Sequence, residues 1–165
     1  QYSEGRLRLM PKLPDLPFAE ETPILHAATG VLLGAYAHRT LGDPGGLTQY
    51  GVHIERLPPG TLSSVGHWHE TEDEFCYILS GEVILHENGG ETVLRPGDAA
   101  AWPAGRPDGH CLENRSSSDA TYLILGTRNR HDVVHYPDHD RIVQIDRETR
   151  ARIITDGQGN PVEPR

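Results

Sequence analysis

Apolar and polar side chains alternate along residues 48–57, with apolar residues on one face and polar residues on the other. This period of two predicts a half-buried β-strand, which Pro58-Pro59-Gly60 then ends. Similar short blocks, separated by Gly- and Pro-rich turns, predict further strands at 74–79, 82–87, 91–95, 99–102, 110–114 and 120–126. Residues 24–38 are richer in apolar and small side chains and predict one or two more.

These strands recur at the spacing of an all-β sandwich or barrel. The Ser80-Gly81 pair predicts a tight turn that joins 74–79 and 82–87 into a hairpin. Around this core we expect an extended, proline-rich N-terminal arm at 1–23, a β-barrel at 24–126, and a polar C-terminal extension at 127–165 that packs on the barrel or on a partner subunit.

Composition supports this division and excludes several functions. The 165 residues suit one domain, and the 18 Gly and 13 Pro disfavour a helical bundle. A net charge of −9 argues against binding to nucleic acid or to anionic membrane surfaces. Lys12 is the only lysine. Two cysteines, Cys76 and Cys111, make no disulfide framework.

Neither a membrane span nor a secretory signal is predicted. No apolar run approaches the length that crosses a bilayer. No charged stretch followed by an apolar one opens the chain, so a cytoplasmic protein is expected, although the initial Gln1 leaves a removed leader open.

Candidate chemistry gathers around His67-Trp68-His69, which is followed after four residues by Glu74. In a strand, residues i and i+2 point to the same side, so His67 and His69 present two imidazoles together. Glu74 and His110 each open a later strand, and both can return to the same place. Three imidazoles and a carboxylate predict a site for one divalent transition metal, with two positions left open for water or substrate.

Neighbouring residues have more ordinary interpretations. The acidic residues Glu70, Glu72 and Asp73 are interpreted as a solvated turn. Cys76, two residues after Glu74, is expected to point inward, as a small buried hydrophobe or as a group near the ligand.

Two spaced patterns resemble the two motifs of the cupin superfamily. The first runs from Gly60 through His67-x-His69 and Glu74 to Gly81, and the second runs from Gly97 through Pro103-x-Gly105 and His110 to Asn114. The Gly60–His67 and Gly105–His110 intervals are longer than is usual in the family, which lengthens loops and leaves the ligand types intact. Blocks such as Leu94-Arg95-Pro96-Gly97-Asp98 and Tyr136-Pro137-Asp138 are similar to a group of bacterial single-domain cupins loosely described as sugar-phosphate isomerases.

The resemblance implies a double-stranded β-helix (jelly-roll) cupin barrel with N- and C-terminal arms, paired as a homodimer. It also implies one divalent ion per chain, Fe, Mn, Ni or Zn, and a small oxygen-rich ligand or substrate that chelates the ion. Isomerase- or epimerase-like chemistry and dioxygenase chemistry both stay open, as does a non-catalytic ligand-binding or scaffold role. The near-absence of lysine weighs against a phosphorylated sugar.

Further site residues follow from these expectations. A base beside the metal would be His53 or Glu55, if their strand face lines the barrel. Candidate substrate-binding residues are Gln49, Cys76, Tyr77 and Trp102.

Overall fold

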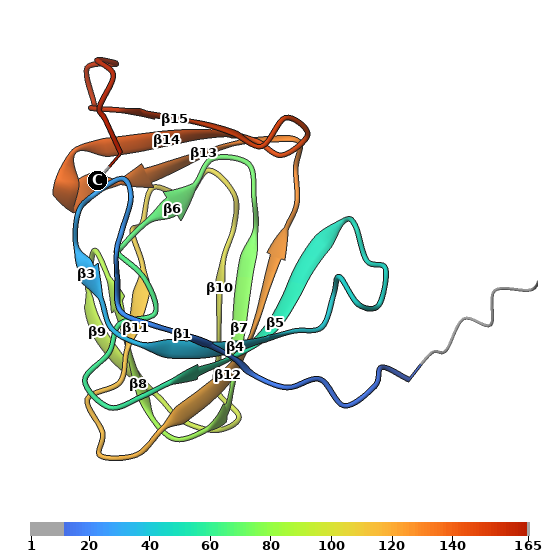
Figure 1. The fold of residues 1–165 in the computed structure, drawn as a ribbon. Coiled ribbons are helices and arrows are strands. Elements are labelled where there is room, and N and C mark those ends of the chain that lie inside the picture. The colour runs from blue at the N-terminus through green and yellow to red at the C-terminus, as the bar shows by residue number, and fades with distance from the viewer. Residues whose placement is uncertain (1–11, 165) are drawn as a thin grey trace, which may run out of the picture.

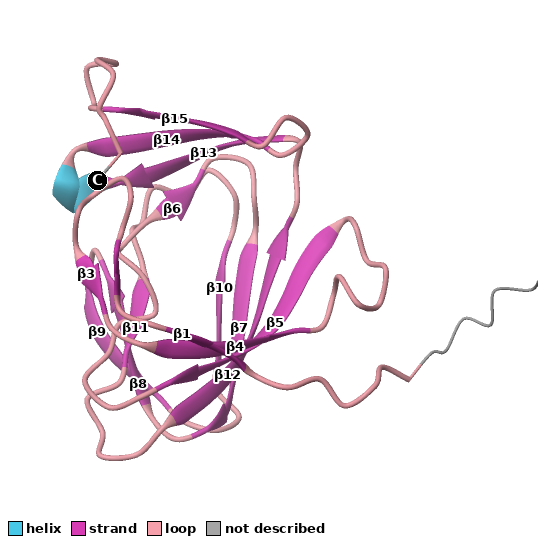
Figure 2. Ribbon diagram, viewed as in Figure 1, coloured by secondary structure: helices cyan, strands magenta, loops and turns pink. Residues whose placement is uncertain are grey.

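A computed structural model describes residues 12–164 of the chain and shows an almost entirely β protein (Figures 1 and 2). Within that part, the only helix is a short 3₁₀ turn at Pro137–His139, and no helix has the length and apolar character needed to cross a membrane. The largest sheet has six antiparallel strands in the order β1 (Ala19–Glu21), β4 (Tyr36–Thr40), β5 (Tyr50–Leu57), β12 (Ala120–Thr127), β7 (Glu74–Ser80) and β10 (Ala99–Trp102).

The opposite side of the molecule is built from smaller sheets. A three-stranded sheet has the order β11 (Cys111–Glu113), β8 (Val83–Glu87) and β9 (Gly90–Leu94). A four-stranded sheet has the order β15 (Ala151–Thr155), β14 (Arg141–Asp146), β13 (His131–Tyr136) and β6 (Trp68–His69). Isolated bridges between Leu62 and Glu113 and between His67 and His110 connect the segment before β6 to β11. A two-stranded ribbon joins β2 (Ile24–Leu25) to β3 (Leu32–Leu33).

The main core lies between the six-stranded and three-stranded sheets. Period-two alternation decides which residues enter it: in β7, Cys76 and Ile78 are buried while Phe75, Tyr77 and Leu79 are exposed. Buried Val83, Leu85, Leu94 and Leu112 meet them from the opposite sheet. Two apolar faces packed in this way form the double-stranded β-helix that the sequence predicts.

The predicted hairpin at Ser80-Gly81 is wrong, although both of its strands exist. β7 pairs with β12 and β10, whereas β8 pairs with β11 and β9, so the turn carries the chain from one sheet to the other. Gly81 has a φ of 76°, and a Cβ placed there would lie 2.6 Å from the carbonyl oxygen of Asp119. The tight turn is therefore a corner between sheets, because a jelly roll connects its strands across the core.

The C-terminal segment contains three strands that the sequence patterns did not predict. β13, β14 and β15 lie across the top of Figure 1 and have a small core of Ala28, Val134, Val143 and Ile154. β13 pairs with β6, with Val134 opposite His69. Charged residues on the outer faces of these strands dilute the apolar positions, which hid them in the sequence. The segment is thus structurally continuous with the histidine-bearing strand.

Part of the expected N-terminal arm also becomes a strand. Ala19–Glu21 adds to the edge of the six-stranded sheet by pairing with β4. Residues 1–11 of that arm lie outside the described residues.

Candidate metal centre

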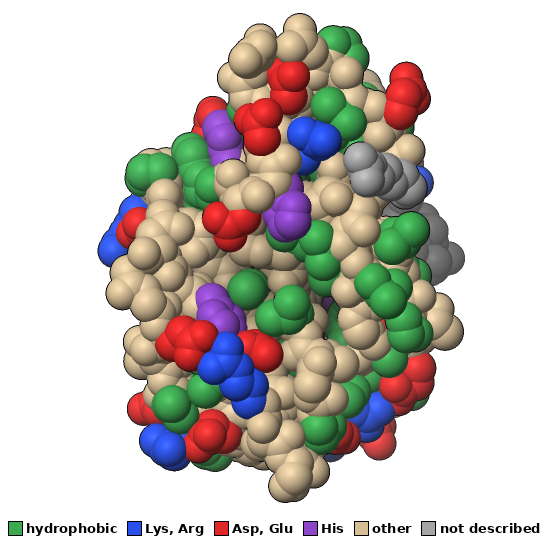
Figure 3. Space-filling model, turned by 90° about the vertical axis from the view of Figure 1, so that its left-hand side faces the viewer, with side chains coloured by type: hydrophobic (Ala, Val, Ile, Leu, Met, Phe, Trp, Pro, Cys, Tyr) green, Lys and Arg blue, Asp and Glu red, His purple; other side chains and the backbone are tan. Residues whose placement is uncertain are grey.

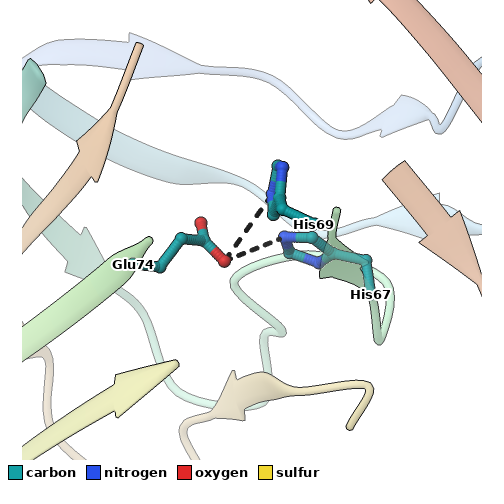
Figure 4. Close-up of side chains that lie close together, drawn as sticks. All are labelled: His67, His69 and Glu74. Atoms are coloured by element: carbon teal, nitrogen blue, oxygen red, sulfur yellow. Dashed lines mark ion pairs between the residues drawn. The ribbon is translucent and has the colours of Figure 1, made fainter. Parts of the chain in front are cut away.

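Three of the four predicted metal ligands meet between β6 and β7. His67 precedes β6, His69 lies in it and Glu74 opens β7, and their side chains point toward one another (Figure 4). Nε2 of His67 lies 3.7 Å and Nε2 of His69 lies 3.6 Å from Oε2 of Glu74. One ligand atom from each of the three side chains falls within 4.8 Å of the others. This is the separation expected of groups that share one ion.

The fourth predicted ligand, His110, reaches the same carboxylate. Its Nε2 lies 2.8 Å from Oε2 of Glu74. The backbones of His110 and His67 exchange two hydrogen bonds, of 3.0 and 3.2 Å, so the segment before β6 and the entry to β11 fix both histidines together. The Trp102 ring stacks on the His110 ring at a centroid distance of 3.9 Å. That stack sets the plane of the imidazole.

In each of the three imidazoles, the contact made by Nδ1 fixes the direction in which Nε2 points. Nδ1 of His67 donates to the carbonyl oxygen of Val65 at 2.8 Å, and Nδ1 of His69 donates to Oδ2 of Asp132 at 2.5 Å. Nδ1 of His110 faces the carbonyl oxygen of Asp108 at 3.4 Å. Because each Nδ1 faces an oxygen atom, Nε2 is the ring nitrogen turned toward Glu74.

This donor set fits a divalent transition ion. Burial alone would raise the pKa of Glu74, but the hydrogen bonds from His110 and His67 and the nearby charge of His69 outweigh it and hold that pKa well below its usual range. An ionised carboxylate therefore shares a partly buried space with three imidazole Nε2 atoms, whose lone pairs become available when a cation replaces the protons that point at Glu74. Such a set of acceptors is satisfied by a cation between them, and its mixed N and O donors suit Fe, Mn, Ni or Zn.

Asp132 is a residue of the candidate centre that sequence reasoning missed. Its buried side chain accepts from Nδ1 of His69, from the backbone N–H of Thr71 at 3.0 Å and from the Thr71 hydroxyl at 2.9 Å. Burial lowers the pKa of His69, but Asp132 and Glu74 together raise it above its usual value. Asp132 follows the expected barrel in a segment interpreted as a polar extension, so no spacing pattern linked it to His69.

The acidic turn before Glu74 differs in part from its interpretation as solvated. Glu72 is only 4% exposed, and its carboxylate accepts from Nε and Nη2 of Arg147 at 2.8 and 2.6 Å and from the backbone N–H of Asn129 at 3.0 Å. The solvated interpretation is wrong for Glu72, because β14 and β13 belong to a sheet that covers this turn. Glu70 is exposed and contacts His135.

A cavity of about 130 Å³ is lined by three of the four ligand-type side chains, His67, Glu74 and His110. Glu55, from the inward face of β5, lines it together with Tyr122, and the Tyr122 hydroxyl donates to Oε2 of Glu55 at 2.5 Å. Burial raises the pKa of Glu55, more than the Tyr122 hydrogen bond lowers it. Trp102 also lines the cavity.

Other candidates lie elsewhere. His53 is half-buried, and burial, followed by the charge of Arg128, lowers its pKa; it is not among the cavity-lining residues. Gln49 is exposed just before β5, and Tyr77 is exposed on the outer face of β7. Cys76 is fully buried in the core, where burial raises the pKa of its thiol to about 11.

Comparisons with known proteins agree with this geometry. The family model of the Cupin domain matches residues 53–126. An oxalate-binding protein of Thermotoga maritima is 42% identical over 71 residues, which cover 42% of this chain and 55% of that protein. The chain therefore spans about half the length of this curated relative.

Solved structures match over a larger part of the chain. A structure from Acidithiobacillus ferrooxidans is 27% identical with a TM-score of 0.72, covering 78% of this chain and 80% of that one. A cupin-superfamily sugar phosphate isomerase from Silicibacter pomeroyi is 35% identical with a TM-score of 0.81, covering 90% of this chain and 96% of that one. With this likeness and the double-stranded β-helix established, the chain belongs to the cupin superfamily.

Proposed function

We propose that this cupin is a metal-dependent enzyme acting on a small, oxygen-rich metabolite. His67, His69, Glu74 and His110 would hold one divalent ion, Fe, Mn, Ni or Zn, and the substrate would supply two oxygen ligands. The observation that carries the proposal is the convergence of three imidazole Nε2 atoms on one carboxylate, each imidazole facing an oxygen with its Nδ1. A histidine kept for packing alone needs no such orientation.

The ion, when bound, supplies Lewis-acid stabilisation of negative charge that develops on a substrate oxygen. The chain would supply the base. Glu55 lines the same cavity, and a buried carboxylate with a raised pKa is suited to take a proton from carbon near neutral pH. The Tyr122 hydroxyl would fix the Glu55 carboxylate while its other oxygen faces the substrate.

Isomerase-like proton transfer is the favoured chemistry. The likeness to a sugar phosphate isomerase from Silicibacter pomeroyi supports it, and Glu55 provides the base that such a reaction requires. Dioxygenase chemistry stays a prediction without a specific supporting observation. His53 does not line the cavity, which leaves Glu55 as the candidate base.

Proton exchange tests this proposal directly. Metal-loaded protein is incubated with pyruvate or hydroxyacetone in D₂O, and exchange of the protons next to the oxo group is followed by NMR. We expect exchange that Glu55→Gln lowers by about 10²–10⁴-fold, the usual contribution of a general base. Glu82→Gln, a change at a surface carboxylate of the same type, should leave the rate unchanged. Exchange no faster than with the free ion would contradict an enzymatic role.

A binding role without catalysis is the second candidate. It is favoured by the likeness to an oxalate-binding protein of Thermotoga maritima. The same experiment separates the two roles, because a binding protein would take up a chelating acid tightly and leave its carbon-bound protons in place.

A further inference from the structure

The cavity at the candidate metal centre is small. Its volume of about 130 Å³ is well below the roughly 300–1,000 Å³ of pockets that enclose drug-sized ligands. Leu112, Trp102 and Ile124 form apolar walls, and the rest of the lining comes from hydroxyl, carboxyl, imidazole and thiol groups. A ligand that reaches the ion must therefore be short, with a carbon skeleton against the apolar walls and oxygen atoms toward His67, Glu74 and His110.

The same cavity has no cationic side chain to receive a phosphate. Its lining, all within residues 12–164, includes neither lysine nor arginine, the residues that usually neutralise phosphoryl oxygens. A phosphate would instead lie beside the Glu55 and Glu74 side chains. A phosphoryl group enclosed there would lose its hydration without a lysine or arginine to replace it, which is strongly unfavourable.

Arginines do gather elsewhere, but they are already paired. A surface groove lined by Arg128, Arg130 and Arg147 shares no lining residue with the cavity. Those side chains form ion pairs with Asp43, Glu148 and Glu72, respectively. On the face shown in Figure 3, basic side chains likewise lie beside acidic ones and form no separate basic patch.

The charge of the proposed centre further limits the chemical class of the ligand. A divalent ion with neutral histidines and the Glu74 carboxylate carries one net positive charge, which a single carboxylate neutralises. An additional phosphate would leave uncompensated negative charge. We propose that the ligand is a small unphosphorylated 2-hydroxy or 2-oxo carboxylate, which chelates through one carboxylate oxygen and the adjacent hydroxyl or oxo oxygen. This inference rests on the proposed metal centre and names its substrate class.

A matched pair of acids tests it. The protein is loaded with Co(II), whose visible absorption changes when a ligand enters its coordination sphere, and is titrated with D-glycerate or with 3-phospho-D-glycerate. Both acids have the same carboxylate and 2-hydroxyl group and differ in the phosphate. We expect D-glycerate to bind at least about tenfold more tightly, because the cavity lining offers the phosphate neither lysine nor arginine.

Two variants tie the binding to this cavity. Ile124→Phe fills space beside the ion without removing a ligand-type side chain, so cobalt uptake should persist while the spectral response to D-glycerate is lost. Ile124→Val should keep both. Equal or tighter binding of the phosphorylated acid, or no response to either acid in cobalt-loaded wild-type protein, would overturn the proposed substrate class and leave the metal centre standing. A protein that takes up no cobalt would overturn the metal centre, and the substrate class with it.

Discussion

At the scale of single residues, each imidazole of the candidate centre has an oxygen atom facing its Nδ1. His69 has the strongest such partner, because Asp132 is a buried carboxylate held in turn by the backbone and hydroxyl of Thr71. A charged acceptor at this position fixes the tautomer of His69 and increases its basicity toward a cation.

Asp132→Asn tests this role. It keeps the size of the side chain but removes its charge, so we expect metal affinity to fall by about 10–100-fold, as for other partners of metal-bound histidines. Competition with a chromophoric chelator measures the change. Asp119→Asn, at an exposed carboxylate, should leave the affinity as it is. Equal affinities in all three proteins would exclude a positioning role for Asp132.

Glu55 should make stability depend on pH. Its pKa in the folded state is raised, chiefly by burial, so the folded protein holds the Glu55 proton after the unfolded chain has released it. The wild type should therefore lose stability relative to Glu55→Gln as pH rises from the usual glutamate range through the raised pKa, by about 1.4 kcal/mol for each unit of the shift.

Urea unfolding of metal-free protein at several pH values measures this difference. Below the usual pKa of glutamate, wild type and Glu55→Gln should differ least, because Glu55 is neutral in both the folded and the unfolded states. A difference in unfolding free energy that stays constant with pH would contradict the buried position of Glu55.

His67 and His69 were predictable because their signal is local, whereas Glu74 and His110 were added because each opens a strand within a pattern that resembles the cupin motifs. Residues i and i+2 of an extended segment point to the same side, so the spacing of His67 and His69 alone predicts that their side chains lie together. Asp132 gives no local signal, since its relation to His69 exists only after β13 pairs with β6. Glu55 stayed ambiguous for a similar reason: alternation placed it on a face of β5 but did not say which face is inward.

At the scale of elements, the turns that connect two sheets restrict the residue type more strongly than the strands do. Gly81 and Gly60 both have a φ of 76°, but only at Gly81 would a Cβ collide with backbone, at 2.6 Å from the carbonyl oxygen of Asp119. Around Gly60 there is open space within 4 Å. A substitution at Gly60 therefore tests the backbone strain of a positive φ alone, whereas the same substitution at Gly81 adds a steric collision.

Gly60→Ala should lower the free energy of unfolding by about 1–2 kcal/mol, the usual penalty of a left-handed alanine. Gly81→Ala should lower it clearly more, because the Asp119–Ala120 backbone must also move. Denaturant unfolding of the two variants measures the difference. Equal losses would show that the corner tolerates a side chain.

Strand positions were largely predictable, and strand partners were not. Period-two alternation located β5, and short apolar blocks bounded by Gly- and Pro-rich turns located β7, β8 and β10, all within about a residue or two of their ends. The tight Ser80-Gly81 turn then suggested pairing between neighbours, although a jelly roll sends consecutive strands to opposite sheets. The strands of the C-terminal sheet escaped notice because their apolar faces are narrow and their outer faces charged.

At the scale of the whole molecule, the C-terminal sheet packs against the candidate site. The segment after residue 126 lies beyond the part that matches the Cupin domain, but it contributes Asp132 behind His69 and Arg147 against Glu72. The predicted homodimer stays a prediction. The six-stranded sheet does expose Tyr50, Phe75, Tyr77 and Leu79 on its outer face, which a second subunit would cover.

Metal content decides the central claim. Protein purified without a polyhistidine tag or chelators is analysed by elemental mass spectrometry, beside His69→Ala prepared in the same way. We predict about one equivalent of iron, manganese, nickel or zinc per wild-type chain, and almost none in the variant, whose circular dichroism should still show the folded β protein. Wild-type protein that binds no metal even after anaerobic reconstitution, or a variant with full metal content, would contradict the proposed centre.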